Sequence, residues 1–158
     1  MTINQKLAEF ENALDENNKK YLLDKVTINE EVEDILNLKL SVIKVLPKDE
    51  CYANAFILAE FALFLQKEYN RESAKFKWLE QNLNNVIAKE GSNYGDKFTK
   101  HEVRKSLIMA NDEYAKVLGD NILKASTQLE SLNFLATRVN TMAEILTDFA
   151  RSKRNYNG

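Results

Sequence analysis

Basic and aromatic side chains alternate in two stretches of this 158-residue sequence, and no other pattern in it points as directly to chemistry. Lysine and arginine pair with phosphates while aromatic rings stack on unpaired bases, so the alternation favours binding of single-stranded nucleic acid. The first stretch contains Lys67, Tyr69, Arg71, Lys75, Phe76, Lys77 and Trp78. The second stretch contains Lys89, Tyr94, Lys97, Phe98, Lys100, His101, Arg104 and Lys105.

The first stretch also has a purely structural explanation, which the sequence leaves open. Lys75 and Lys77 would form ion pairs with acidic residues 112–113 across a helical hairpin. Phe76 and Trp78 would then belong to the core. The second stretch is the better candidate, and the predicted nucleic-acid-binding residues are Trp78, Lys89, Tyr94, Lys97, Lys100, His101, Arg104 and Lys105.

The sequence contains little that would support catalysis or metal binding. The single cysteine, Cys51, lies inside an apolar run and is predicted to be a small core residue. His101 stands among cations with only Glu102 as a neighbouring carboxylate, which favours a surface position over a general base. No His, Cys or carboxylate cluster has the spacing of metal ligands. We therefore expect no enzymatic activity, no metal and no cofactor.

Composition and charge predict an all-α protein of the cytoplasm. The chain has 4 glycines and 1 proline, with 44% hydrophobic and 29% charged residues, which disfavours disorder and turn-rich β-sandwiches. The net charge is −2, divided into −5 over residues 1–60 and +3 over residues 61–158. A lone cysteine and the lack of a secretion signal predict the cytoplasm of a bacterium or of a phage-infected host cell.

Two short helices are expected in residues 1–46. The first spans residues 3–17, where apolar residues recur at positions i, i+3 and i+7. The second begins with a capping box formed by Thr27 and the glutamate three residues later, and it continues through Ile43. Pro47 interrupts it and suits the first turn of the next helix, because proline has no N–H to leave unpaired there.

A long helix is predicted over residues 48–90, about 65 Å in length. Thirteen of the fifteen positions in 51–65 are apolar, so we expect this part to be buried on most sides by neighbouring helices. The run is too short for a membrane span, which needs about 20 apolar residues. Residues 91–96 then bring together both turn-forming glycines and polar residues, and they predict a turn.

A second long helix is predicted over residues 100–154, capped by Thr99 and the glutamate three residues later. Gly119 would be its soft point, and a separate final helix starting at Asn140 is the alternative. Ten apolar residues alternate at spacings of four and three, the pattern of a left-handed coiled-coil seam. This seam consists of Leu118, Ile122, Ala125, Leu129, Leu132, Ala136, Val139, Ala143, Leu146 and Ala150.

These elements predict one structural domain: a helical pair over residues 1–46 packed on a long antiparallel hairpin over residues 47–158. The hairpin would place Leu65 opposite about Asn121. A second apolar stripe lies beside the seam, and a helix with two stripes needs two partners. One partner can be the N-terminal helices of the same chain, and we predict that the other is a second copy. The copies of this homo-oligomer would meet through Leu129, Leu132, Leu135, Val139, Met142, Leu146 and Phe149.

The order of these features resembles the UvsY-type recombination mediators of tailed phages over residues 47–154. The resemblance is carried by the apolar helix Tyr52–Leu65, the charged continuation KEYNRESAKFKWLEQ, the turn Asn93–Gly95, the basic segment Lys100–Lys105, the segment Met109–Glu113 and the coiled-coil segment Gln128–Leu132.

The resemblance implies a non-catalytic, ring-forming protein that binds single-stranded DNA. Such a mediator contacts the single-strand-binding protein on the DNA and helps a RecA-like recombinase to replace it. The alternative is a helical phage structural, assembly or host-interaction protein that acts only through protein–protein contacts. Neither hypothesis involves a membrane.

Overall fold

The computed structural model describes residues 29–153 together with Gln5, Ala8, Glu9, Asn12 and Glu16. Among these residues every regular element is helical and no strand occurs, which confirms the predicted all-α class. The rest of the helix predicted over residues 3–17 and the predicted cap Thr27 lie outside the described residues.

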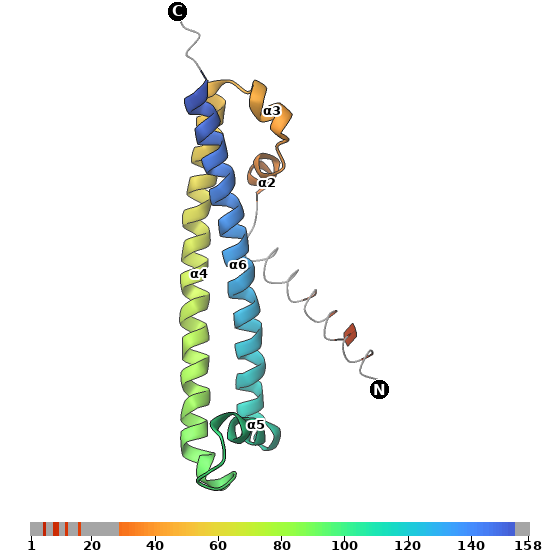
Figure 1. The fold of residues 1–158 in the computed structure, drawn as a ribbon, viewed down its shortest axis with the longest axis vertical. Helices are drawn as coiled ribbons and strands as arrows, with labels where there is room; N and C mark the ends of the chain where they lie inside the picture. Colours follow the sequence, from red (N-terminus) through yellow and green to blue (C-terminus); the bar gives the residue numbers. More distant parts are fainter. Residues whose placement is uncertain (1–4, 6–7, 10–11, 13–15, 17–28, 154–158) are drawn as a thin grey trace, which may run out of the picture. The chain divides into compact units, whose positions relative to one another are not determined.

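The single second helix predicted to continue through Ile43 is wrong, because the segment forms two short helices, α2 and α3. Helix α2 spans Glu30–Leu36, and its N-cap is Asn29, whose Oδ1 accepts a hydrogen bond from the Val32 N–H at 2.8 Å. Helix α3 spans Leu40–Val45. Asn37 ends α2, and the backbone is already extended at the N-cap of α3, so the two helices point in different directions (Figure 1).

Helix α4 spans Lys48–Glu90, which confirms the predicted long helix. Pro47 lies immediately before it, and its carbonyl accepts the first helical hydrogen bond from the Cys51 N–H at 3.1 Å. One face of α4 carries its own seam with spacings of four and three, and every member is buried or half-buried. The α4 seam consists of Cys51, Ala55, Leu58, Ala62, Leu65, Tyr69, Glu72, Phe76, Leu79, Leu83, Val86 and Glu90.

A short 3-10 helix, η2, follows directly at Gly91–Asn93, where the turn was predicted. The next helix is α5, which spans His101–Asn111, and the last is α6, which spans Glu113–Ser152. The predicted single helix over residues 100–154 is therefore wrong. It breaks at Asp112, whose backbone is extended and whose Oδ1 accepts a hydrogen bond from the Ala115 N–H at 3.0 Å. Helix α6 continues unbroken through Gly119 and Asn140.

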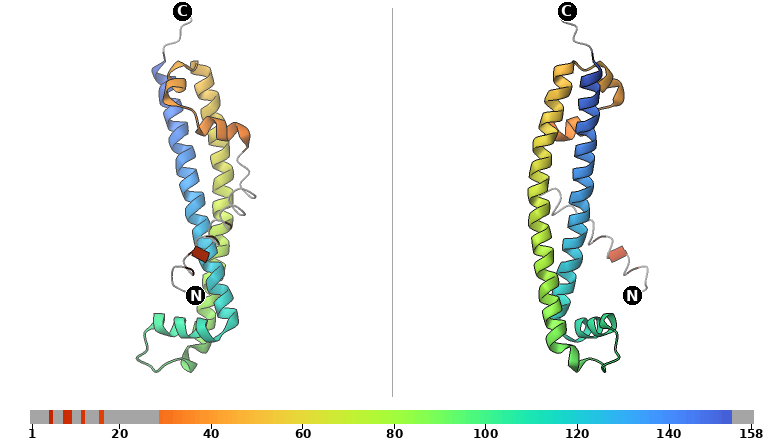
Figure 2. Two further views of the ribbon diagram at one scale, coloured as in Figure 1. Left: turned by 90° about the vertical axis from the view of Figure 1, so that its right-hand side faces the viewer. Right: turned by 60° about the vertical axis from the view of Figure 1, so that its left-hand side comes forward.

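The chain divides into two compact units. Unit 1 comprises Met1–Tyr69 and Glu130–Gly158, and unit 2 comprises Asn70–Leu129. Helices α2 and α3 group in unit 1 with one part of each long helix. In both units α4 and α6 pack side by side and run in opposite directions (Figures 1 and 2).

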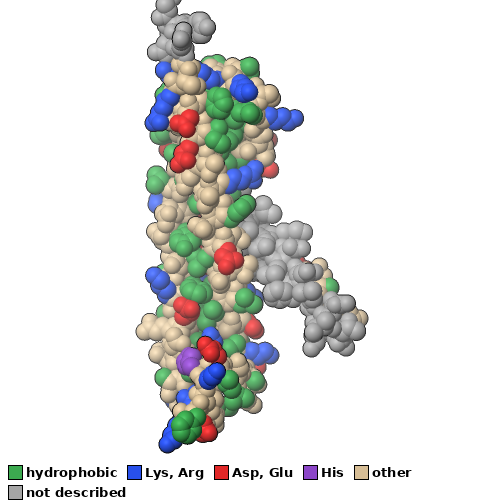
Figure 3. All heavy atoms as spheres, in the orientation of Figure 1, with side chains coloured by type: hydrophobic (Ala, Val, Ile, Leu, Met, Phe, Trp, Pro, Cys, Tyr) green, Lys and Arg blue, Asp and Glu red, His purple; other side chains and the backbone are tan. Residues whose placement is uncertain are grey.

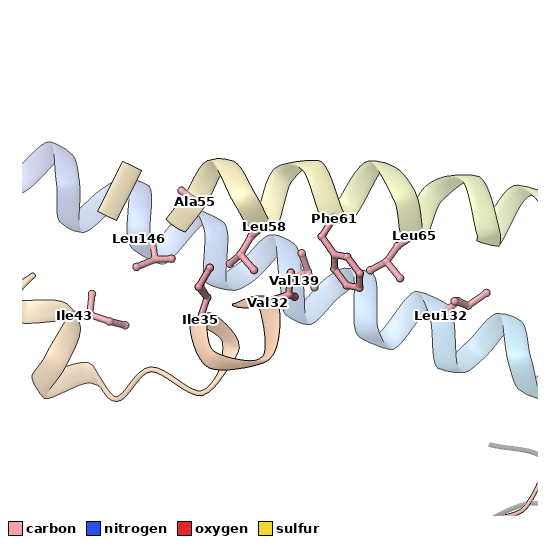
Figure 4. Packing of buried hydrophobic residues seen from close by; sticks show 10 residues of the cluster. All are labelled: Val32, Ile35, Ile43, Ala55, Leu58, Phe61, Leu65, Leu132, Val139 and Leu146. Carbon is pink, nitrogen blue, oxygen red and sulfur yellow. The ribbon is translucent and has the colours of Figure 1, made fainter. Parts of the chain in front are cut away.

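The core of unit 1 is formed by side chains of α4, of α6 and of the short helices α2 and α3 (Figure 4). Leu58 and Leu65 of α4 and Val139 of α6 are fully buried, and Val32 and Ile35 of α2 pack against the same cluster. Lys153 fastens α3 to the end of α6, because its ammonium donates to the carbonyls of Ile43 at 2.8 Å, Lys44 at 3.3 Å and Leu46. Together α2 and α3 thus cover one side of the α4–α6 pair.

In unit 2, helix α5 lies crosswise to the start of α6 (Figure 2). Its Ile108 is fully buried in one cluster with Leu83 of α4 and Leu118 of α6. A Cβ at Gly119 would lie 2.4 Å from Cε of Met109, so the missing side chain makes room for α5. Helix α5 also contains 11 residues that were predicted to belong to the second long helix of the hairpin.

This difference changes the register of the hairpin. Leu65 lies in the cluster that contains Leu132, instead of opposite Asn121 as predicted. None of the helices in the described part of the chain has the length and apolarity needed to cross a membrane.

Candidate nucleic-acid interface

The second basic–aromatic stretch surrounds the loop between α4 and α5, and all of it belongs to unit 2. The loop begins at Gly91, which is buried, and Asn93 donates a side-chain hydrogen bond to Oε2 of Glu90 at 2.9 Å. Residues 94–100 then run without regular structure to the start of α5.

Gly95 allows the loop to reverse direction. Its φ angle is 90°, a left-handed backbone conformation that residues other than glycine rarely adopt. A Cβ at this position would lie 2.3 Å from Oγ1 of Thr99, so any other residue would also collide with the loop. Gly95 is thus required for this loop shape.

Hydrogen bonds of the Asp96 and Thr99 side chains to the loop backbone stabilise the loop. Oδ1 of Asp96 accepts a hydrogen bond from the Phe98 N–H at 2.8 Å, and Oγ1 of Thr99 accepts one from the Asp96 N–H at 3.0 Å. The predicted capping of the following helix by Thr99 is therefore wrong. Lys100 is the N-cap of α5 instead, and it makes no side-chain capping bond.

Arg104 ties α5 back to the loop. Its Nε donates to the Tyr94 carbonyl at 3.2 Å, and its Nη2 donates to the Asp96 carbonyl at 2.7 Å. Its guanidinium donors are thus directed at the loop backbone, and Arg104 positions the loop in this structure. A phosphate contact by Arg104 stays a prediction, and it would have to use donors other than the N–H groups already bonded to the loop.

The loop presents Phe98 to solvent. Phe98 is 80% exposed, and Nζ of Lys97 lies 5.1 Å from the centre of its ring, within the range of a cation–π contact. An exposed large aromatic ring beside a cation on a hydrogen-bonded loop is a ready platform for a stacked base. The sequence analysis placed Phe98 in the stretch but did not select it.

The structure brings part of the predicted set together on this loop and its flanks. Lys89, Lys97, Lys100 and His101 are exposed, and with Phe98 they form what we call the loop surface. Basic and hydrophobic side chains lie next to each other at the lower end of Figure 3. Residues 89–105 hold five basic and three acidic side chains, so the net charge of the segment is +2.

The remaining predicted contacts have other surroundings. Tyr94 is half-buried against the unit 2 core, and Lys105 is half-buried on α5. Trp78 is 60% exposed on α4, eleven residues before Lys89. Eleven residues are three helical turns, so Trp78 and Lys89 share one face about 16 Å apart along the axis.

The structural explanation of the first stretch holds only in part. Phe76 packs against the unit 2 core, as that explanation requires, whereas Trp78 does not. Lys75 approaches the buried Glu72 on its own helix, with Nζ 3.5 Å from Oε2. Helix α5 intervenes before residues 112–113, which explains why Lys75 finds a partner one turn away instead of across the hairpin.

The predicted oligomerisation residues pack inside the chain. Leu132, Val139 and Leu146 are fully buried in the core of unit 1, which removes them from any surface that a second copy meets. Leu135, Met142 and Phe149 are half-buried against the same cluster, which α2 and α3 join. Leu129 is also half-buried, and it belongs to unit 2.

No three His, Cys, Asp or Glu side chains among the described residues could hold a metal ion together. The thiol of Cys51 is free and fully buried in the α4 seam.

Comparisons with known proteins identify no relative: the chain matches no protein-family model, no curated protein and no solved structure.

Proposed function

We propose that this protein is a non-catalytic binder of single-stranded DNA that uses the loop surface of unit 2. The observation that carries the proposal is the exposed Phe98 ring beside Lys97 on a loop held by Asp96 and Arg104. The ring is available to stack on a base at about 1 to 3 kcal/mol. Lys97 and Lys100 are available to pair with the phosphates on either side.

One loop surface binds weakly, because the segment 89–105 that carries it has five basic residues partly balanced by three acidic ones. Self-association multiplies a weak site, since a strand that spans several copies is held by all of them at once. We therefore infer that the protein acts as a homo-oligomer and that its affinity falls steeply as salt increases.

Fluorescence anisotropy of a labelled oligo-dT strand at low and high salt tests the proposal. We expect salt-sensitive binding at micromolar protein, and a loss of about tenfold or more for Phe98→Ala. Lys97→Glu with Lys100→Glu should abolish binding. Absence of salt-sensitive binding by the wild-type chain contradicts the proposal.

The matched control is Lys116→Glu with Lys124→Glu, which makes the same change of charge on exposed positions of α6. A specific loop surface predicts that this control binds nearly as well as wild type. An equal loss in both double variants would mean that only overall charge matters. Arg104 is unsuitable for this test, because its substitution releases the loop as well as removing a charge.

The resemblance to UvsY-type mediators supports a more specific role. In that role the protein binds DNA already coated by a single-strand-binding protein and helps a RecA-like recombinase to replace it. The test is DNA-dependent ATP hydrolysis by a RecA-like recombinase on coated DNA. We expect the protein to shorten the lag before hydrolysis, and an unchanged lag contradicts the mediator role while leaving DNA binding intact.

A second candidate function is a helical phage structural, assembly or host-interaction protein. The apolar side chains exposed on α4, with Phe56 at 64% and Leu63 at 67%, favour it, because such exposure marks protein–protein contact surfaces. A chain that binds no oligo-dT yet self-associates would fit this alternative.

A further inference from the structure

In unit 1, the described residues of the chain leave one apolar face of α4 uncovered. Tyr52, Phe56, Ala59 and Leu63 follow one another at spacings of four, three and four, which places them on a single face of the helix. We call them the α4 stripe. All four are exposed, and the two largest exposures are those of Phe56 and Leu63.

The α4 stripe and the helices α2 and α3 lie on different sides of the α4–α6 pair. Phe61 of α4 packs with Val32 and Ile35 of α2, whereas the stripe is rotated away from Phe61 around the helix. The sequence of residues 51–65 predicted burial on most sides. Within residues 29–153, the chain covers the seam of this part of α4 and its side next to α2 and α3.

An open groove runs beside the α4 stripe, between α4 and α6. It has a volume of 520 Å³, and its α4 wall is formed by Ala55 and Ala59. The α6 wall combines Ala143 and Thr147 with four larger polar side chains, those of Asn140, Glu144, Asp148 and Arg151. The small side chains of the α4 wall allow the backbone of another helix to approach α4 closely. A partner helix would thus contact the stripe and the groove together.

We propose that a second copy of this chain covers the α4 stripe, with the two α4 helices antiparallel and a two-fold axis between Ala59 and Glu60. The stripe is complementary to itself in this arrangement. The axis places Phe56 against Leu63 of the second copy, and the reverse contact follows by symmetry. It also places Tyr52 against Lys67 of the second copy, which suits a cation–π contact.

The surface available is of the right order for such a pair. Fully buried aromatic side chains hide about 150–250 Å² each, so the exposed parts of Tyr52, Phe56 and Leu63 amount to roughly 300 Å² in one copy. Two copies supply about 600 Å², which is below the roughly 1,000 Å² of a stable specific interface and fits a weak, reversible pair. Ala59 at the axis keeps the two helices close.

The inference deepens the assembly step of the proposed function by naming its surface. Sedimentation and light scattering over a concentration series test it with the full chain. We expect a reversible dimer, and a dissociation constant at least about tenfold higher for Phe56→Lys or Leu63→Glu, since either leaves a charge against an apolar surface. A wild-type chain that is monomeric at about 1 mM overturns the proposal.

The double variant Phe56→Lys with Leu63→Glu tests the register. In the antiparallel pair each new lysine faces the new glutamate of the other copy, so the double variant should recover most of the dimer that each single variant loses. A double variant that associates as weakly as the single variants overturns the antiparallel register.

Two controls distinguish association through this surface from non-specific hydrophobic association. Phe134 is 73% exposed on α6 in the same unit, and Phe134→Lys should leave the dimer unchanged. Ala59→Cys should form a disulfide between copies under mild oxidation, whereas Phe134→Cys should not. Equal effects at positions 59 and 134 would contradict a specific α4 interface.

The outcomes distinguish this proposal from DNA binding. Lys97→Glu with Lys100→Glu should lose DNA and keep the dimer, because those residues belong to unit 2. DNA binding by a strictly monomeric wild-type chain would overturn the α4 interface and the inferred self-association, and it would leave DNA binding by the loop surface intact. A dimer that ignores oligo-dT would overturn the proposed function alone.

Discussion

The two apolar surfaces of the long helices differ in what covers them. The seam of α6 has Leu132, Val139 and Leu146 fully buried, although we predicted that a second copy would cover part of this helix. The α4 stripe has Phe56 and Leu63 mostly exposed, although we predicted that neighbouring helices would cover it. The side chains that we predicted to meet a second copy are thus buried within the chain, and those that we predicted to be buried are exposed.

This difference shows what apolar periodicity conveys. It identifies the faces of a helix that avoid water, but it does not identify the chain that covers each face. The decision depends on α2 and α3, which are short and supply only a few buried side chains, among them Val32, Ile35 and Ile43. Two short helices can cover one side of the pair and leave the other open.

Truncation of one leucine on each surface should give the largest contrast. Leu146→Ala should destabilise the fold by about 2 to 5 kcal/mol, because it leaves a cavity in a fully buried site. Leu63→Ala should change the free energy of unfolding by less than about 0.5 kcal/mol. Urea unfolding followed by circular dichroism at low protein concentration measures both. Similar losses would contradict the difference in burial.

Removal of the ammonium that fastens α3 should have a smaller effect. Lys153→Met should cost about 1 to 2 kcal/mol, because three carbonyls at the end of α3 lose a charged donor. Arg151→Met is the matched control, since its ion pair with Asp148 at 3.6 Å is exposed and contributes little. Equal stability of the two variants would show that Lys153 does not hold α3 in place.

The N-caps of α2 and α3 offer the finest comparison. Asn29→Ala should cost about 1 kcal/mol, because the Val32 N–H loses its side-chain acceptor. Lys39→Ala should cost almost nothing, since Lys39 makes no capping bond at the start of α3. Thermal unfolding of the two variants measures the difference, and a larger loss for Lys39→Ala would contradict the assigned caps.

Much of the fold followed from local sequence signals. The absence of Pro and Gly between residues 48 and 90 predicted α4, and the breakers from Gly91 to Asp96 predicted the turn after it. These features depend on backbone preferences of neighbouring residues, which a sequence displays directly. The break at Asp112 was missed, although the coiled-coil spacing begins only at Leu118. That gap was the available signal for a separate α5.

The candidate site was predictable as a stretch but not as an arrangement. The sequence indicated basic and aromatic residues near the turn, and the structure places Lys97 and Lys100 there with exposed side chains. The role of Arg104 depends on hydrogen bonds to residues eight and ten positions away. The exposure of Phe98 depends on the loop shape that Gly95 permits. Neither is encoded in local spacing.

The buried Cys51 has a practical consequence, because it is the sole thiol in the sequence and lies in the α4 seam. A thiol reagent can reach it only during moments when unit 1 opens, so the labelling rate in native buffer reports how often that opening occurs. The rate of Cys51 labelling therefore measures the opening of the helical pair, and no cysteine has to be introduced for this purpose.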